Sequence, residues 1–167
     1  GDRVHYDYAT KNMGTWIIHG PFDGTRDVSD AAARLDGGGE ELFSPGDLAA
    51  DGLPDLVVMG VAASYDSDGT LVPADEEAEA AWIEYGPFVG VHAVGEGVAL
   101  LPDVTAGHVG EDVAFPGDLD GDGYPELLLS ETSWPAGTGG SSALVWGPVC
   151  ESRAYSQNAL VFTPELE

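Results

Sequence analysis

The chain has 167 residues, enough for one domain or a few small repeats. Five Lys and Arg face 30 Asp and Glu, so the net charge is −25, which argues against nucleic acid or anionic lipid as a partner and favours cations. No apolar run reaches the roughly 18 residues of a membrane span, so we expect no membrane insertion.

The spacing of turn residues indicates an all-β fold. The 24 Gly and 11 Pro divide the chain into short apolar runs of strand length. Acidic residues lie between these runs, and the chain has four Trp and six Tyr, so a folded chain is favoured over a disordered acidic tail. The single cysteine, Cys150, cannot form an intrachain disulfide; we expect it to be a small buried apolar side chain, with an intermolecular link as the alternative.

A strand-like run that ends in Gly-Pro recurs along the chain. The Gly-Pro steps begin at Gly20, Gly86 and Gly147, which are 66 and 61 residues apart. A period of this length, built from short strands, is typical of stacked supersecondary units such as propeller blades. The sequence therefore predicts repeated units and not one irregular sheet.

An acidic loop precedes the second of the two later Gly-Pro runs. Oxygen-bearing side chains occupy positions 1, 3, 5 and 9 of this loop: Asp118, Asp120, Asp122 and Glu126. Gly123 permits the positive φ of a tight turn, and the carbonyl of Tyr124 would be the ligand at position 7. Calcium takes 6–8 oxygen ligands, and four carboxylates this close repel one another without a cation. The pattern predicts a calcium site, against the alternative of an acidic turn without metal.

The flanks of this loop distinguish it from an EF-hand. An EF-hand needs Glu at position 12 and a following helix, whereas position 12 here is Leu129 within a short apolar run. A second apolar run, which includes Phe115, precedes the loop. A calcium loop between two strands is expected.

An earlier stretch, 71 residues upstream, repeats the loop in degenerate form. Its position 3 is Ala49, so three side-chain ligands and one carbonyl remain as metal candidates: Asp47, Asp51, Asp55 and the backbone of Leu53. This copy is either a weaker calcium site or a turn without metal.

The run Phe-Pro-Gly-Asp-Leu-Asp-Gly-Asp-Gly-Tyr-Pro-Glu-Leu-Leu-Leu, residues 115–129, resembles the FG-GAP repeat of integrin α-subunit β-propellers. The resemblance implies calcium-binding blades of four antiparallel strands, with the calcium loop joining the first strand to the second. Two features depart from that family. The Gly-Ala-Pro signature after the second strand is replaced in both copies, and the first loop lacks its acid at position 3.

This resemblance divides the chain into a partial blade that has only the second, third and fourth strands (1–40), a blade with a degenerate calcium loop (41–107) and a blade with a complete one (108–167). The expected strands are 4–8, 15–19, 31–35, 41–44, 56–59, 81–85, 97–101, 112–115, 127–130, 143–146 and 159–163. The acidic insert 62–80 is expected to be a solvated loop.

The sequence shows no catalytic motif. The four histidines are scattered, and neither a nucleophile elbow nor a phosphate-binding loop is present. We expect a non-enzymatic, calcium-stabilised module of propeller type, extracellular or at the cell surface, that serves protein interaction or assembly. Two alternatives are a structural subunit that assembles into a ring or filament, and the propeller portion of a secreted hydrolase or lyase.

The number of units suggests how the module is completed. Propellers typically close with 4–8 blades, more than this chain supplies. An unpaired edge at Val4–Tyr8 and an apolar run at Ala159–Thr163 predict head-to-tail contact with further copies, or docking onto the rest of a larger propeller or another protein partner.

Overall fold

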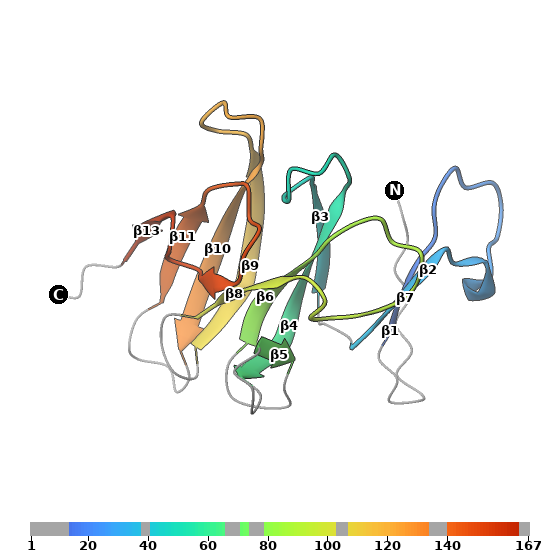
Figure 1. The fold of residues 1–167 in the computed structure, drawn as a ribbon, viewed down its shortest axis with the longest axis horizontal. Helices are drawn as coiled ribbons and strands as arrows, with labels where there is room; N and C mark the ends of the chain where they lie inside the picture. The colour runs from blue at the N-terminus through green and yellow to red at the C-terminus, as the bar shows by residue number, and fades with distance from the viewer. Residues whose placement is uncertain are drawn as a thin grey trace.

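The computed structural model describes residues 14–37, 41–65, 71–73, 79–102, 107–133 and 140–163. Over these residues the chain is all-β apart from one 3-10 turn, η1 (Val28–Asp30), so the predicted all-β class is confirmed, while the described strands do not close into a propeller. The expected strand 4–8 lies outside the described residues. The sheets follow one another along the longest axis of the molecule, with β1 and β2 at one end and β13 at the other (Figure 1).

The first large unit is a four-stranded antiparallel meander. Each strand pairs with the next in the expected order: β3 (Glu41–Gly46), β4 (Asp55–Tyr65), β6 (Glu79–Glu84) and β8 (Val98–Leu101). The first acidic loop therefore joins the first strand of this unit to the second.

The second large unit repeats this arrangement. Its strands also pair antiparallel in sequence order: β9 (Gly107–Gly117), β10 (Glu126–Ser133), β11 (Ser141–Val145) and β13 (Ala159–Phe162). A single parallel pairing, Glu79 with His108, joins β6 of the first unit to β9 of the second. The second acidic loop connects β9 to β10, as predicted.

A smaller sheet lies at the other end of the chain. Here β1 (Gly14–Ile17) pairs antiparallel with β2 (Ala33–Asp36), and β7 (Gly90–Ala93) adds to β2 in parallel. In the same way β12 (Arg153–Ala154) adds in parallel to β8. We call β7 and β12 the junction strands. In the sequence, each follows the third strand of its own unit and precedes the fourth. In space, each pairs with the fourth strand of the preceding unit, which is β2 for β7 and β8 for β12. Neither was predicted.

Two expectations were wrong. The insert 62–80 is not simply a solvated loop, because β4 continues to Tyr65 and pairs with β5 (Leu71–Pro73), and β6 already begins at Glu79. Pairing between the two arms satisfies the backbone there in spite of the acidic composition. Cys150 is exposed and not buried; its thiol lies 3.5 Å from the carbonyl of Ala49, at the surface of the first acidic loop.

The main core lies between the two meanders. Leu127 and Leu129 on β10 are fully buried, while Leu128 between them is only partly buried, as the two-residue period of a strand requires. Leu100 on β8 is also fully buried, within the same cluster. The corresponding strand of the last unit, β13, differs, since Leu160 is 50% exposed.

This contrast predicts the effect of truncating each leucine. Leu100→Ala should lower the free energy of unfolding by about 2–5 kcal/mol, because it leaves a cavity in the core. Leu160→Ala, the control on the fourth strand of the last unit, should change it by less than about 0.5 kcal/mol when the chain is monomeric. Urea denaturation measures both values. Equal losses for the two variants would contradict the described packing.

Candidate metal centre

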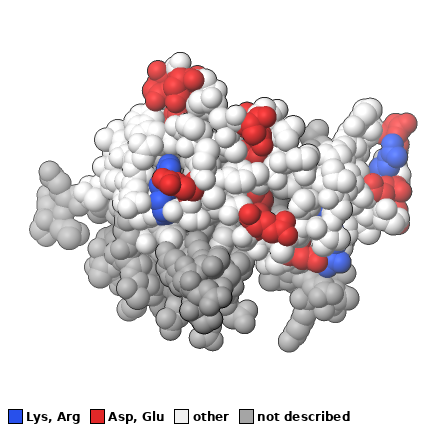
Figure 2. All heavy atoms as spheres, viewed as in Figure 1, with Lys and Arg blue, Asp and Glu red and all other residues white. Residues whose placement is uncertain are grey.

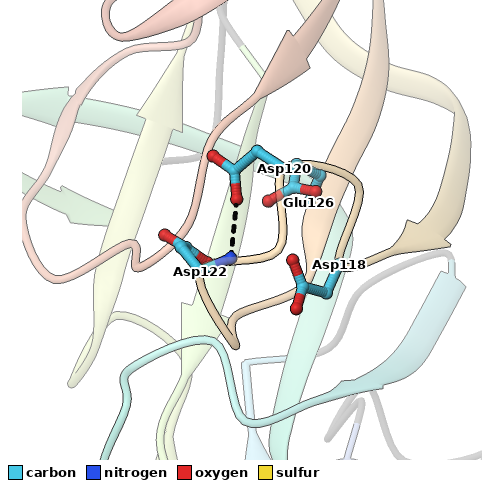
Figure 3. A group of neighbouring side chains, drawn as sticks. All are labelled: Asp118, Asp120, Asp122 and Glu126. Carbon is cyan, nitrogen blue, oxygen red and sulfur yellow. Dashed lines mark hydrogen bonds between the residues drawn. The ribbon is translucent and has the colours of Figure 1, made fainter.

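The second acidic loop brings four carboxylates together. Each can offer one oxygen such that the four atoms lie within 4.8 Å of one another: Asp118, Asp120, Asp122 and Glu126. The three aspartates are exposed, and Glu126, at the start of β10, is fully buried. Figure 3 shows the four side chains gathered around the loop. Oxygen ligands of this kind suit a hard cation, so the group could hold a metal ion.

Hydrogen bonds within the loop hold the aspartates in place. Asp118 accepts N–H bonds from Gly121 (2.7 Å) and Gly123 (3.0 Å), and both glycines have positive φ. Asp120 accepts the amide of Asp122 at 3.0 Å, the bond that is dashed in Figure 3. Asp122 in turn accepts the amide of Tyr124 at 2.9 Å. A carboxylate has about four lone-pair sites, so each aspartate keeps capacity to bind a cation.

Glu126 is the unusual member of the group. One of its carboxylate oxygens, Oε2, accepts the amide of Leu119. The other, Oε1, is buried and has no hydrogen-bond partner. A buried polar atom without a partner costs free energy, and nearly all such atoms in folded proteins are satisfied. A cation held among the four carboxylates would supply the missing partner.

In the first acidic loop, backbone amides supply the hydrogen-bond partners of the buried carboxyl group, and no cation is needed. Asp55 is fully buried, and its two oxygens accept three amide bonds, from Leu48 (2.7 Å), Ala49 (3.0 Å) and Gly86 (3.2 Å). Burial raises the pKa of Asp55, and these three N–H donors oppose that rise. The buried carboxyl group is therefore satisfied by the protein itself.

The other acids of the first loop are also occupied by the loop. Asp47 accepts the amides of Asp51 (3.0 Å) and Gly52 (2.7 Å), and Asp51 accepts the amide of Leu53 (2.8 Å). Within the described residues, Asp47, Asp51 and Asp55 are not brought together as metal ligands in the way that the second loop is. Of the two interpretations of this loop, a closed turn without metal fits the geometry better.

Two substitutions account for the difference between the loops. Ala49 stands where the second loop has Asp120, so one ligand is missing. Asp55 stands where the second loop has the longer Glu126, whose Oε1 has no hydrogen-bond partner. The carbonyls of Tyr124 and Leu53 as ligands remain predictions.

The contribution of the Gly-Pro steps to these loops was not predicted from the sequence. A Cβ on Gly86 would lie 2.7 Å from the carbonyl oxygen of Pro54, and one on Gly147 would lie 2.9 Å from that of Pro125. Each glycine thus lets the third strand end against the end of an acidic loop. The recurrence of Gly-Pro after the third strand of each unit was the feature of the sequence that could have indicated this contact.

No protein-family model matches the chain, and no curated protein or solved structure that was compared with it does so. No helix of the described residues has the length and apolar character that a membrane crossing requires.

The three hydrogen bonds of Asp55 predict how a substitution at this position changes stability. Asp55→Asn replaces one acceptor oxygen with an NH₂ group that faces amide donors, so it should lower the free energy of unfolding by about 1–3 kcal/mol. The loss should be the same with and without a divalent cation. Asp51→Asn, on an exposed residue of the same loop, is the control and should cost less. A loss that is clearly larger with calcium than with chelator would show that the first loop binds metal after all.

Proposed function

We propose that the chain is a non-catalytic, calcium-stabilised module of β-propeller type, in which calcium has a structural role. The observation that supports this most strongly is the buried, unpartnered Oε1 of Glu126, which belongs to the same group as three exposed carboxylates. An ordinary acidic turn would leave its carboxylates in water. This loop places one carboxylate in the interior and gives it only half of the partners it needs.

The ligand chemistry favours calcium over other cations. Zinc in structural sites is held largely by Cys and His, and neither is part of this group. Magnesium demands near-ideal octahedral geometry and keeps several waters, whereas calcium accepts 6–8 oxygens in flexible geometry at about 2.3–2.6 Å. Four carboxylates on a turn, with the carbonyl of Tyr124 as the proposed fifth ligand, fit calcium best.

The position of Glu126 gives calcium its proposed role. Glu126 is the first residue of β10, and the next residues of that strand include Leu127 and Leu129 of the main core. A cation would offset repulsion among the four carboxylates and fix the start of β10 against the loop. Calcium binding is thereby coupled to packing of the core and needs no catalytic step.

The repeat supports a propeller-type arrangement. Two four-stranded meanders and a smaller related sheet succeed one another, each with a Gly-Pro step after its third strand. The FG-GAP resemblance of the second loop points to the same architecture. Since propellers typically close with 4–8 blades, we propose that further blades come from other copies or from another protein.

The acidic net charge of the chain limits which kinds of partner it can bind. Acidic side chains form several separate patches on the visible face, with few basic side chains among them (Figure 2). With a net charge of −25 the chain would repel nucleic acid, so the proposed partner is a protein. Extracellular calcium modules work with dissociation constants of about 10⁻⁴–10⁻³ M, and we propose a location outside the cell or on its surface.

The matched loops provide the test of this function. A ligand that binds only the folded state stabilises it by about 2.7 kcal/mol at 100 times its dissociation constant, so chelation should lower the melting temperature. Asp122→Ala should abolish most of this calcium response. Asp51→Ala is the control, because each aspartate accepts one amide bond of similar length within its loop, 2.9 Å and 2.8 Å respectively. The control should respond to calcium like the unmodified chain.

Thermal unfolding followed by circular dichroism, with calcium and with chelator, measures all three proteins. A melting temperature that does not respond to chelation would refute the proposed structural calcium. Equal loss of the response in both variants would refute its assignment to the second loop.

A further inference from the structure

The junction between the smaller sheet and the first meander depends on two apolar anchors. The first, Phe88, directly follows the Gly-Pro step and is buried in a cluster with Ile17 and Ala33 of the preceding unit. The second, Val94, is buried with Leu35 and donates its amide to the carbonyl of Asp36 at 2.8 Å. Junction strand β7 lies between the two anchors.

The junction between the two meanders has the same construction. Val149, which follows the Gly-Pro step, is fully buried and donates its amide to the carbonyl of Leu48 at 2.8 Å. Six residues later, Tyr155 is fully buried and donates its amide to the carbonyl of Leu101 at 2.9 Å. The register also agrees, since β12 pairs with β8 as β7 pairs with β2.

The first unit carries the same two anchors, but they are not covered. Phe22 follows the first Gly-Pro step and is 39% exposed, and Val28, six residues later, is 40% exposed. We call residues 20–30 the head segment. Its turn is already formed, because Asp30 donates its amide to the carbonyl of Asp27 at 2.9 Å.

The same backbone bond closes the turn in both later units. It joins Glu96 to Ala93 at 3.3 Å and Gln157 to Ala154 at 3.0 Å. The head segment therefore has the turn of a junction, and no strand among the described residues pairs with it as β2 and β8 pair with the junction strands. Little further ordering of this turn would be needed for docking.

The opposite end of the chain exposes the surface that such anchors bury elsewhere. Leu48 of the first acidic loop is fully buried beneath the second meander, whereas its counterpart Leu119 is 55% exposed. On the last strand, Leu160 and Phe162 are each 50% exposed. We call Leu119, Leu160 and Phe162 the tail surface. Among the described residues β13 pairs only with β11, and no described strand pairs with its outer edge.

We propose that the head segment of one copy docks on the tail surface of a second copy and reproduces the internal junctions. The two surfaces lie at opposite ends of the molecule, so one chain cannot join its own head to its own tail (Figure 1). The contact is heterologous, and such contacts form rings or filaments depending on the rotation per copy. This inference rests on the propeller-type repeat of the proposed function and names the partner of that repeat.

The internal registers specify the contact. Ala33, Val98 and Leu160 are equivalent, because they pair with equivalent residues of the third strands: Ile17, Ile83 and Leu144. Phe22 should therefore pack on Leu160, as Phe88 packs in the cluster of Ala33. The head segment should run parallel to β13, with the amide of Val28 donating to the carbonyl of Thr163. The amide of Phe22 should donate to the carbonyl of Leu119, as Val149 does to Leu48.

The test uses single substitutions on each surface. With calcium present, the mass of the unmodified chain from multi-angle light scattering should rise with concentration to at least twice that of a monomer. Phe22→Asp and Leu160→Asp should each remain monomeric, because each places a charge in an apolar contact. Val89→Asp is the control, since Val89 is 70% exposed and outside both surfaces, and it should associate normally.

Mixing the two monomeric variants tests directly whether the head segment binds the tail surface. Phe22→Asp keeps an intact tail surface and Leu160→Asp keeps an intact head segment, so together they can form one native junction. The mixture should give a 1:1 dimer and nothing larger. A monomeric unmodified chain, or a mixture that stays monomeric, would overturn the proposal and leave both surfaces to a different protein or repeat.

The calcium response of the same samples separates this inference from the proposed function. Both variants should melt at a higher temperature with calcium, because neither substitution removes a carboxylate of the loop. If that response persists while the unmodified chain stays monomeric, only the docking proposal fails. If the response is absent, the structural calcium fails.

Discussion

The buried carboxyl group at the ninth position of each acidic loop is the constraint on which the rest of the structure depends. Asp55 and Glu126 each stand at the start of the second strand of a meander, where the loop meets the core. A carboxyl group in this position must be satisfied, or the strand cannot start there without a large cost in free energy. The first loop satisfies it with three amides, and the second provides one amide and three neighbouring carboxylates.

The two loops therefore share a backbone turn but differ in how their buried carboxyl group is satisfied. Asp47 and Asp118 accept amides at the same places in their loops, from Gly52 and Gly123, so the turn itself does not require a metal. What differs is the buried end. We propose that a one-methylene difference in side-chain length, with one acid more or less at the third position, decides whether the protein or a cation completes the site. We therefore propose that the second unit, and not the first, is stabilised by a cation.

Much of the fold could be predicted from the sequence because short motifs recur in each repeated unit. The Gly-Pro steps and the acidic loops marked where strands end, and the FG-GAP resemblance implied the four-strand order of both meanders. The junction strands could not be predicted, because Gly90–Ala93 and Arg153–Ala154 are short, lack clear alternation and are fixed only by a neighbouring unit. The state of Asp55 was hidden for a similar reason, since one of its donors, Gly86, is 31 residues away.

The most direct test of the central claim is a crystal structure of the chain grown with calcium. The account predicts an ion about 2.3–2.6 Å from Oε1 of Glu126 and coordinated by Asp118, Asp120 and Asp122, with Asp55 still bonded to its three amides and no ion beside it. An empty second loop at saturating calcium, with Oε1 of Glu126 bonded to protein or water alone, would contradict it.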